Sequence, residues 1–166
     1  MDEYRALAER LDALPNGFPP AEDGAELRLL QKLFAPEEAA LAAVLRMTLE
    51  THDQIAERVD ADPEAVRLML KSMAKRGLIK AGRTEHGLGF GLLPFVVGIY
   101  EYQIGRMDAE LAGLFEDYYQ QAFTQVLAVN PQVHRVIPVN ETIRVDLEVA
   151  PYESVSAILD LSLIHI

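Results

Sequence analysis

The sequence predicts an α+β protein that is mainly α-helical. Helix start signals precede apolar residues at helical spacing in the first half of the chain. A proline-free stretch over residues 95–127 then suits a long helix, and residues 143–149 alternate between apolar and polar side chains, as a half-buried strand does. Half of the 166 residues are hydrophobic and 25% are charged, a balance typical of a folded globular protein.

Residues 1–35 are predicted to form a helical N-terminal segment. Leucines on one side indicate a helix over residues 1–14, and Pro15-Asn16-Gly17 ends it. Residues 26–34 suit a second short helix.

Residues 36–95 carry three successive helix start signals. Pro36 followed by two glutamates suits a first helical turn, because the positive end of the helix dipole favours acidic side chains. Thr51 and Gln54 have the spacing of a capping box, and Asp62 before Pro63 combines an N-cap with a favoured first helical residue.

The end of the third of these helices and the segment after it indicate a hairpin. Gly77 is expected to end the helix in the left-handed conformation, and residues 78–81 and 88–93 read as strands around a turn at 82–87. Glycines in the second strand are expected to let another backbone approach. Three helices and a hairpin, with a four-residue turn between the second and third helices, follow the winged helix-turn-helix plan, so 36–95 is predicted to be a winged-helix-like domain.

Residues 96–129 are predicted to form the long helix. Apolar residues at alternating steps of four and three form a coiled-coil-like seam on it. This seam packs either on the winged-helix-like domain or against a second copy in a homodimer, and both interpretations stay open. Its members are Tyr100, Ile104, Met107, Leu111, Leu114 and Tyr118.

Residues 130–160 are predicted to form a β-hairpin and the start of a helix. Asn130-Pro131 stops the preceding helix, and residues 133–139 and 143–149 pair around a turn. Pro151 then opens the last helix.

The composition excludes several classes of function. The formal net charge of −11 argues against non-specific nucleic-acid coating and against a polybasic membrane anchor. The absence of cysteine excludes disulfides, thiol catalysis, cysteine-ligated zinc and a self-contained iron–sulfur centre. No stretch is apolar over the length of a bilayer and the start does not resemble a signal peptide, so a cytoplasmic location is expected.

No motif indicates an active site, so the chain is not expected to be an enzyme. The four histidines lack metal-ligand spacing and are interpreted as chance surface residues. The glycines over residues 87–91 do not fit a dinucleotide fingerprint, and the chain holds neither a P-loop nor a nucleophile elbow. No catalytic residue, cofactor-binding residue or metal ligand is therefore assigned.

One basic strip stands out in this acidic chain. Residues 62–83 carry a local charge of +4, and Arg67, Lys71 and Lys75 follow one another at steps of four on the third predicted helix. In a DNA-binding protein this would be the recognition helix, with Arg83 in the wing reaching a phosphate. The same charges suit the solvent face of any amphipathic helix, so both interpretations stay open.

Six fragments carry a resemblance to a known family: LPNGFP (14–19), AELRLL (25–30), LFAPEEA (33–39), MAKRGLI (73–79), LPFVVGIYE (93–101) and RVIPV (135–139). In this order, over roughly residues 1–160, they resemble the N-terminal region of prokaryotic 4Fe-4S ferredoxin-type iron–sulfur proteins. The resemblance implies a winged-helix-like module and a long helix before a C-terminal ferredoxin domain that binds [4Fe–4S] clusters and transfers electrons.

The resemblance sets the leading hypothesis for function. The chain is expected to be an N-terminal fragment, a non-catalytic scaffold or docking module for the missing ferredoxin domain and an unidentified redox partner. With no cysteine, no cluster ligand carries over. Residues 161–166 (LSLIHI) resemble translated sequencing adapter and are expected to be an artefactual tail; a natural short protein with a packed tail is the alternative. The alternative function is a winged-helix DNA-binding transcriptional regulator.

Overall fold

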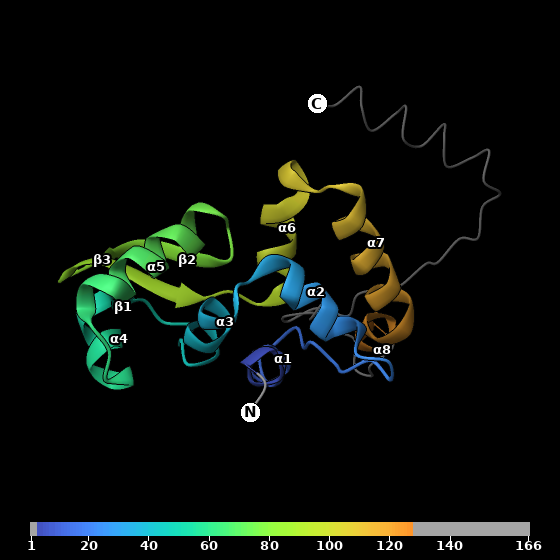
Figure 1. Ribbon diagram of the computed structural model, residues 1–166, viewed down its shortest axis with the longest axis horizontal. Coiled ribbons are helices and arrows are strands. Elements are labelled where there is room, and N and C mark those ends of the chain that lie inside the picture. The colour runs from blue at the N-terminus through green and yellow to red at the C-terminus, as the bar shows by residue number, and fades with distance from the viewer. Residues whose placement is uncertain (1–2, 128–166) are drawn as a thin grey trace, which may run out of the picture. The chain divides into compact units, whose positions relative to one another are not determined.

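The computed structural model describes residues 3–127, which are mainly helical with one small antiparallel sheet (Figure 1). The α+β, mainly α class predicted from the sequence is therefore confirmed for this part of the chain. The hairpin and helix start predicted over residues 130–160, and the tail at 161–166, lie outside the described residues.

The first three helices pack together at the N-terminal end of the fold. They are α1 (Glu3–Asp12), α2 (Ala25–Leu33) and α3 (Pro36–Ala43), in agreement with the predicted helices. Leucines at helical spacing give α1 a fully buried face that packs against α2 and α3. The hydroxyl of Tyr4 also donates a hydrogen bond to the carbonyl of Phe34, 3.0 Å away, and so ties α1 to the end of α2.

The predicted capping signals position α4 (His52–Val59) and α5 (Pro63–Lys75). The Thr51 hydroxyl accepts a hydrogen bond from the backbone N–H of Gln54 at 3.4 Å, and the Gln54 side chain accepts one from the Thr51 N–H at 2.9 Å. The Asp62 carboxylate caps α5 ahead of Pro63. Each helix therefore starts at the predicted residue, because a side chain satisfies an otherwise unbonded backbone donor there.

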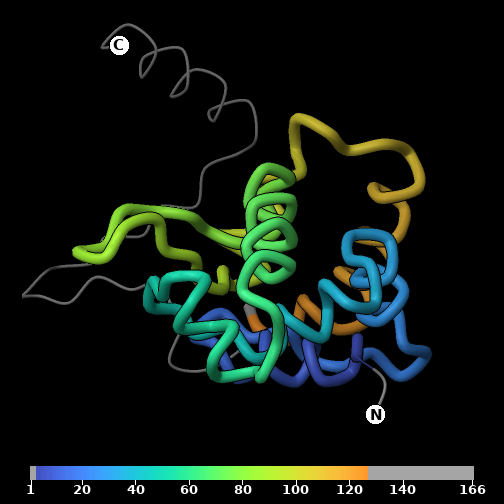
Figure 2. Tube along the Cα trace, turned by 60° about the vertical axis from the view of Figure 1, so that its left-hand side comes forward, coloured from blue at the N-terminus to red at the C-terminus, as the bar shows by residue number. Residues whose placement is uncertain are grey.

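The sheet has the strand order β1-β3-β2 and is antiparallel throughout, with β1 (Glu50–Thr51), β2 (Ile79–Thr84) and β3 (Gly87–Leu92). The turn predicted at residues 82–87 is wrong in extent, since the strands pair up to Thr84 and Gly87 and leave only a two-residue connection. Gly82 lies inside β2, where it leaves room for the side chain of Leu49. Figure 2 shows this hairpin beside α5, extending away from the α1–α3 helices.

The glycines of β3 permit the close backbone approach that the sequence predicts. A Cβ at Gly91 would lie 3.0 Å from the Met47 carbonyl oxygen and 3.1 Å from that of Arg46. The Arg46 carbonyl accepts a hydrogen bond from the N–H of Leu92 at 2.8 Å. The glycine pattern therefore serves chain packing beside β3.

The single long helix predicted over residues 96–129 is wrong. The chain forms α6 (Tyr100–Gln103) and then, after a short 3₁₀ turn and an extended Met107, a second helical stretch made of α7 (Ala109–Tyr118), a π-helical turn and α8 (Thr124–Leu127). The break follows from Asp108, whose carboxylate accepts a hydrogen bond from the Leu111 N–H at 2.7 Å and caps a new helix.

A second irregularity precedes α6. Val97 adopts a left-handed conformation, with φ 59°, and the backbone N–H groups of Val97 and Gly98 both donate to the carboxylate of Glu101, at 2.9 and 2.6 Å. Glu101 therefore satisfies the donors at the start of α6, and the helix begins only after the bend.

Five of the six predicted seam residues lie in or against the core of the same chain, as the interpretation of packing within the chain expects. Leu111 and Tyr118 are buried in the core of the same chain, whereas Ile104 is 62% exposed. Leu111 lies against Leu29 and Leu33, and α7 packs along α2. These contacts favour packing within the chain over the homodimer interpretation, and the break at Asp108 interrupts the seam.

The centre of the described core joins segments far apart in the sequence. The ring of Phe18 lies 4.6 Å from that of Phe95 and 4.7 Å from that of Tyr118, centroid to centroid. The Tyr118 hydroxyl donates to the carbonyl of Pro19 at 3.1 Å. The aromatic rings thus hold the segment after α1, the segment after β3 and α7 together.

Candidate functional site

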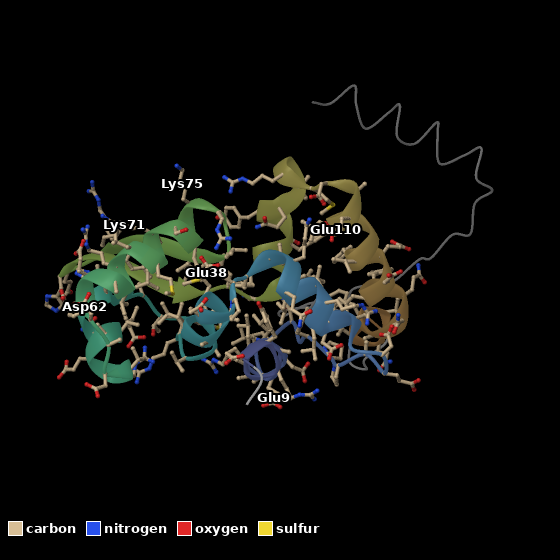
Figure 3. All side chains as sticks on the ribbon, viewed as in Figure 1. Glu9, Glu38, Asp62, Lys71, Lys75 and Glu110 are labelled. Carbon is tan, nitrogen blue, oxygen red and sulfur yellow. The ribbon has the colours of Figure 1, made fainter. Side chains whose placement is uncertain are left out.

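The basic strip predicted from the sequence lies on the solvent side of α5. Lys71 and Lys75 are exposed and point away from the helix (Figure 3), while the opposite side of α5 buries Val66, Leu70 and Met73. Arg83 is also exposed, on β2. The amphipathic spacing of α5 therefore decides which of its residues reach solvent.

Arg67, the first residue of the strip, is already paired. Its Nε and Nη2 atoms donate to the two carboxylate oxygens of Glu64, at 2.7 and 2.5 Å. These hydrogen bonds hold the pKa of Glu64 below its usual value, with smaller contributions from the charges of Arg67, His52 and Lys71. The same pair raises the pKa of Arg67. Three basic side chains therefore lower the pKa of the Glu64 carboxyl.

A hollow of about 210 Å³ opens beside the strip. Its walls come from three elements: the start of α4, the solvent side of α5 and the hairpin at β3. We call it the hairpin hollow. It is lined by Thr51, His52, Asp53, Arg67, Lys71, His86, Leu88 and Phe90. Two residues of the strip thus share a concave surface with two histidines and with the apolar side chains of Leu88 and Phe90.

Other basic side chains near α5 have structural partners. Arg58 donates to Glu50 at 2.6 Å, and Arg76 lies 2.5 Å from Glu38. Arg106 donates to the carbonyl of Lys75 at 2.9 Å. In contrast, within residues 3–127 neither Lys71 nor Lys75 forms an ion pair with a carboxylate. These two lysines are therefore the strip residues most available to an external anion.

A second hollow of about 190 Å³ has the opposite character. It lies beside α1 and is lined by Arg5, Glu9, Asp12 and Glu26 among other residues. Three carboxylates against one guanidinium disfavour an anion there. The hairpin hollow is thus the better anion site of the two.

The sequence did not identify the histidines as part of a site. His52 precedes His86 by 34 residues, and only the return of β3 alongside the start of α4 brings both to the hairpin hollow. His52 Nε2 also lies 3.4 Å from an oxygen of Asp53. No spacing pattern could have revealed this proximity, because it depends on the register between β1 and β3.

Within residues 3–127, no group of three histidine, aspartate or glutamate side chains is placed to hold a metal ion. Nor does any helix in this part of the chain have the length and apolar character needed to cross a bilayer.

Comparisons with protein-family models, with curated proteins and with solved structures find no match to this chain.

Proposed function

We propose that this chain is the N-terminal scaffold of a 4Fe-4S ferredoxin-type iron–sulfur protein, acting as a non-catalytic docking module for an electron-transfer domain. The observation that carries the proposal is that the fragments resembling that family contact one another. The Asn16 side chain, in the 14–19 fragment, donates to the Val96 carbonyl of the 93–101 fragment at 2.6 Å. The rings of Phe18 and Phe95, from the same two fragments, contact each other in a tilted arrangement with their centroids 4.6 Å apart.

A second pair of these fragments is joined by Arg76. Its guanidinium donates to the Leu33 carbonyl at 3.4 Å and lies 2.5 Å from the carboxylate of Glu38, so the 73–79 fragment contacts the 33–39 fragment. Fragments that meet in one core support a shared scaffold better than fragments scattered over a surface would. In this proposal the cluster ligands and the electron transfer would belong to a ferredoxin domain, because this chain has no cysteine.

Sequencing the gene beyond the codon for Asp160 tests this proposal. We expect an open frame that continues with cysteines at C-x-x-C spacing, as [4Fe–4S] ligation requires. A clean genomic sequence in which the frame closes after Ile166 contradicts the proposal.

DNA binding is the second candidate function, and the exposure of Lys71 and Lys75 without ion pairs favours it. We infer that α3, α4, α5 and the β2–β3 hairpin form a winged helix. In this arrangement α5 is the recognition helix and Arg83 lies in the wing. The two lysines and Arg83 would then contact phosphates, while Arg67 would first have to leave Glu64.

A salt titration of binding to the upstream DNA of its own gene tests this second candidate. We expect the affinity for DNA to fall steeply as the salt concentration rises. The double variant Lys71→Glu, Lys75→Glu should bind more weakly, and its plot of the logarithm of the binding constant against the logarithm of salt concentration should have a slope shallower by about 2. The control is Arg5→Glu, Arg28→Glu, which makes the same charge change on α1 and α2. Unchanged binding in the α5 variant, or no binding at low salt, rejects the candidate.

A further inference from the structure

The hairpin hollow has the chemistry of a small anion site. Arg67 and Lys71 bring positive charge to one wall, and His52 and His86 add ring N–H donors from two other elements. Its volume of about 210 Å³ is below the roughly 300–1,000 Å³ of pockets that enclose drug-sized ligands, so it suits a single small group. Asp53 is the one carboxylate among its lining residues.

Glu64 occupies the donors that such an anion would use. It lies one turn before Arg67 on α5 and accepts hydrogen bonds from the Nε and Nη2 atoms of that guanidinium. The Glu64 side chain is 59% exposed, so it can swing into solvent without leaving a buried charge unpaired. Glu64 is therefore an internal counter-ion of Arg67 that lies outside the lining of the hollow and competes for the same guanidinium.

We propose that the hairpin hollow binds a phosphate group through Arg67 and Lys71, and that Glu64 competes with this ligand for Arg67. Phosphate accepts hydrogen bonds on several oxygens, which matches a two-donor guanidinium beside an ammonium group. Leu88 and Phe90 form the apolar part of the hollow and would contact whatever carries the phosphate.

Phosphate binding in the hairpin hollow is independent of the iron–sulfur proposal. It rests on the DNA-binding candidate only if the phosphate belongs to a nucleic acid. A free phosphate and a phosphate of the DNA backbone share the same chemistry. The experiment therefore has one arm for each source.

In the first arm, inorganic phosphate is titrated into the full ¹⁵N-labelled chain and followed by backbone amide shifts. We expect saturable shifts at residues that line the hairpin hollow. Glu64→Gln should bind about two- to fivefold more tightly and Lys71→Gln about two- to fivefold more weakly, the size expected for exposed ion pairs. The control Glu9→Gln removes the same charge beside the acidic hollow and should bind like the wild type (Figure 3).

Several results would overturn the inference. These are the absence of saturable shifts, shifts spread evenly over exposed basic residues, or a gain in Glu9→Gln equal to that in Glu64→Gln. If Glu64→Gln loses helicity by circular dichroism, the exposed Lys71→Gln variant still decides, because unchanged affinity there contradicts the proposal.

The second arm repeats the four proteins with duplex DNA. Tighter DNA binding by Glu64→Gln supports a backbone phosphate as the ligand. Phosphate binding without DNA binding supports the inference and rejects only the DNA-binding candidate. DNA binding that is equal in wild type and Glu64→Gln overturns the role of Glu64 and leaves the DNA-binding candidate standing.

Discussion

Gly77 has two separate reasons to be glycine. Its φ of 76° lies in the left-handed region, and a Cβ at this position would lie 2.5 Å from the Cβ of Tyr102. The sequence predicted the first reason from the position of Gly77 after α5. It could not predict the second, because the contact with Tyr102 arises only when α6 packs over the end of α5, where Gln103 donates to the Arg76 carbonyl at 3.0 Å.

Gly77→Ala is therefore expected to lower the free energy of unfolding by about 2–4 kcal/mol, since left-handed strain adds to a steric clash. Urea denaturation measures this change in the free energy of unfolding. Gly113→Ala is the matched control: Gly113 lies within α7, and nothing lies within 4 Å of the added Cβ. That variant should gain about 0.5–1 kcal/mol through helix propensity. Equal effects at the two positions would contradict this account of Gly77.

The pair of Glu64 and Arg67 makes a prediction about pH. Because the folded pKa of Glu64 is lowered, the pair contributes stability above the ordinary glutamate pKa and loses it as pH falls through the lowered value. Arg67→Gln should raise the pKa of Glu64, and Lys71→Gln should raise it less, because Lys71 acts only through its charge. Carboxyl ¹³C NMR titration measures both. An unchanged titration midpoint in Arg67→Gln would show that the pair does not persist in solution.

At the scale of elements, capping side chains decide where helices start. Thr51, Asp62 and Asp108 each accept a hydrogen bond from a backbone N–H of the first turn. Thr51 was predicted from its capping-box spacing with Gln54, and Asp62 from the proline that follows it. Asp108 was missed because apolar spacing continues past it, and a periodic pattern does not show that a polar side chain has ended one helix and begun another.

Asp108→Ala should therefore destabilise the protein by about 1 kcal/mol through loss of the α7 cap. Asp108→Asn is the control, since asparagine also caps helices and gives up only the exposed ion pair with Lys32, whose Nζ lies 3.1 Å from Asp108. Thermal or urea unfolding should place Asp108→Asn close to the wild type. If both variants lose the same free energy of unfolding, Asp108 stabilises the protein through its ion pair with Lys32 and not through the helix cap.

One buried aromatic cluster joins segments that lie far apart within residues 3–127. Phe18, Phe95 and Tyr118 lie in three segments separated by most of the described chain, and all three side chains are almost completely buried. Burial also raises the pKa of the Tyr118 hydroxyl, with help from the charges of Asp12 and Glu26. The hydroxyl thus stays a hydrogen-bond donor to Pro19 at any ordinary pH.

Phe18→Ala is expected to lower the free energy of unfolding by about 3–5 kcal/mol, because it leaves a cavity between the two other rings. Tyr118→Phe keeps the ring, loses one buried hydrogen bond and should cost about 1 kcal/mol. Urea denaturation followed by circular dichroism measures both. A Phe18→Ala variant as stable as Tyr118→Phe would contradict the central place of this cluster.

Local patterns predicted the helix starts up to Gly77, the presence of the hairpin after it and the solvent face of α5, because capping residues and apolar periodicity act over a few neighbouring positions. The remaining features follow from tertiary contacts. The tertiary structure broke the predicted long helix at Asp108, buried Leu111 and Tyr118 within the chain, and placed His52 and His86 beside Arg67. These outcomes depend on contacts between residues far apart in the chain, and such contacts leave no local pattern in the sequence.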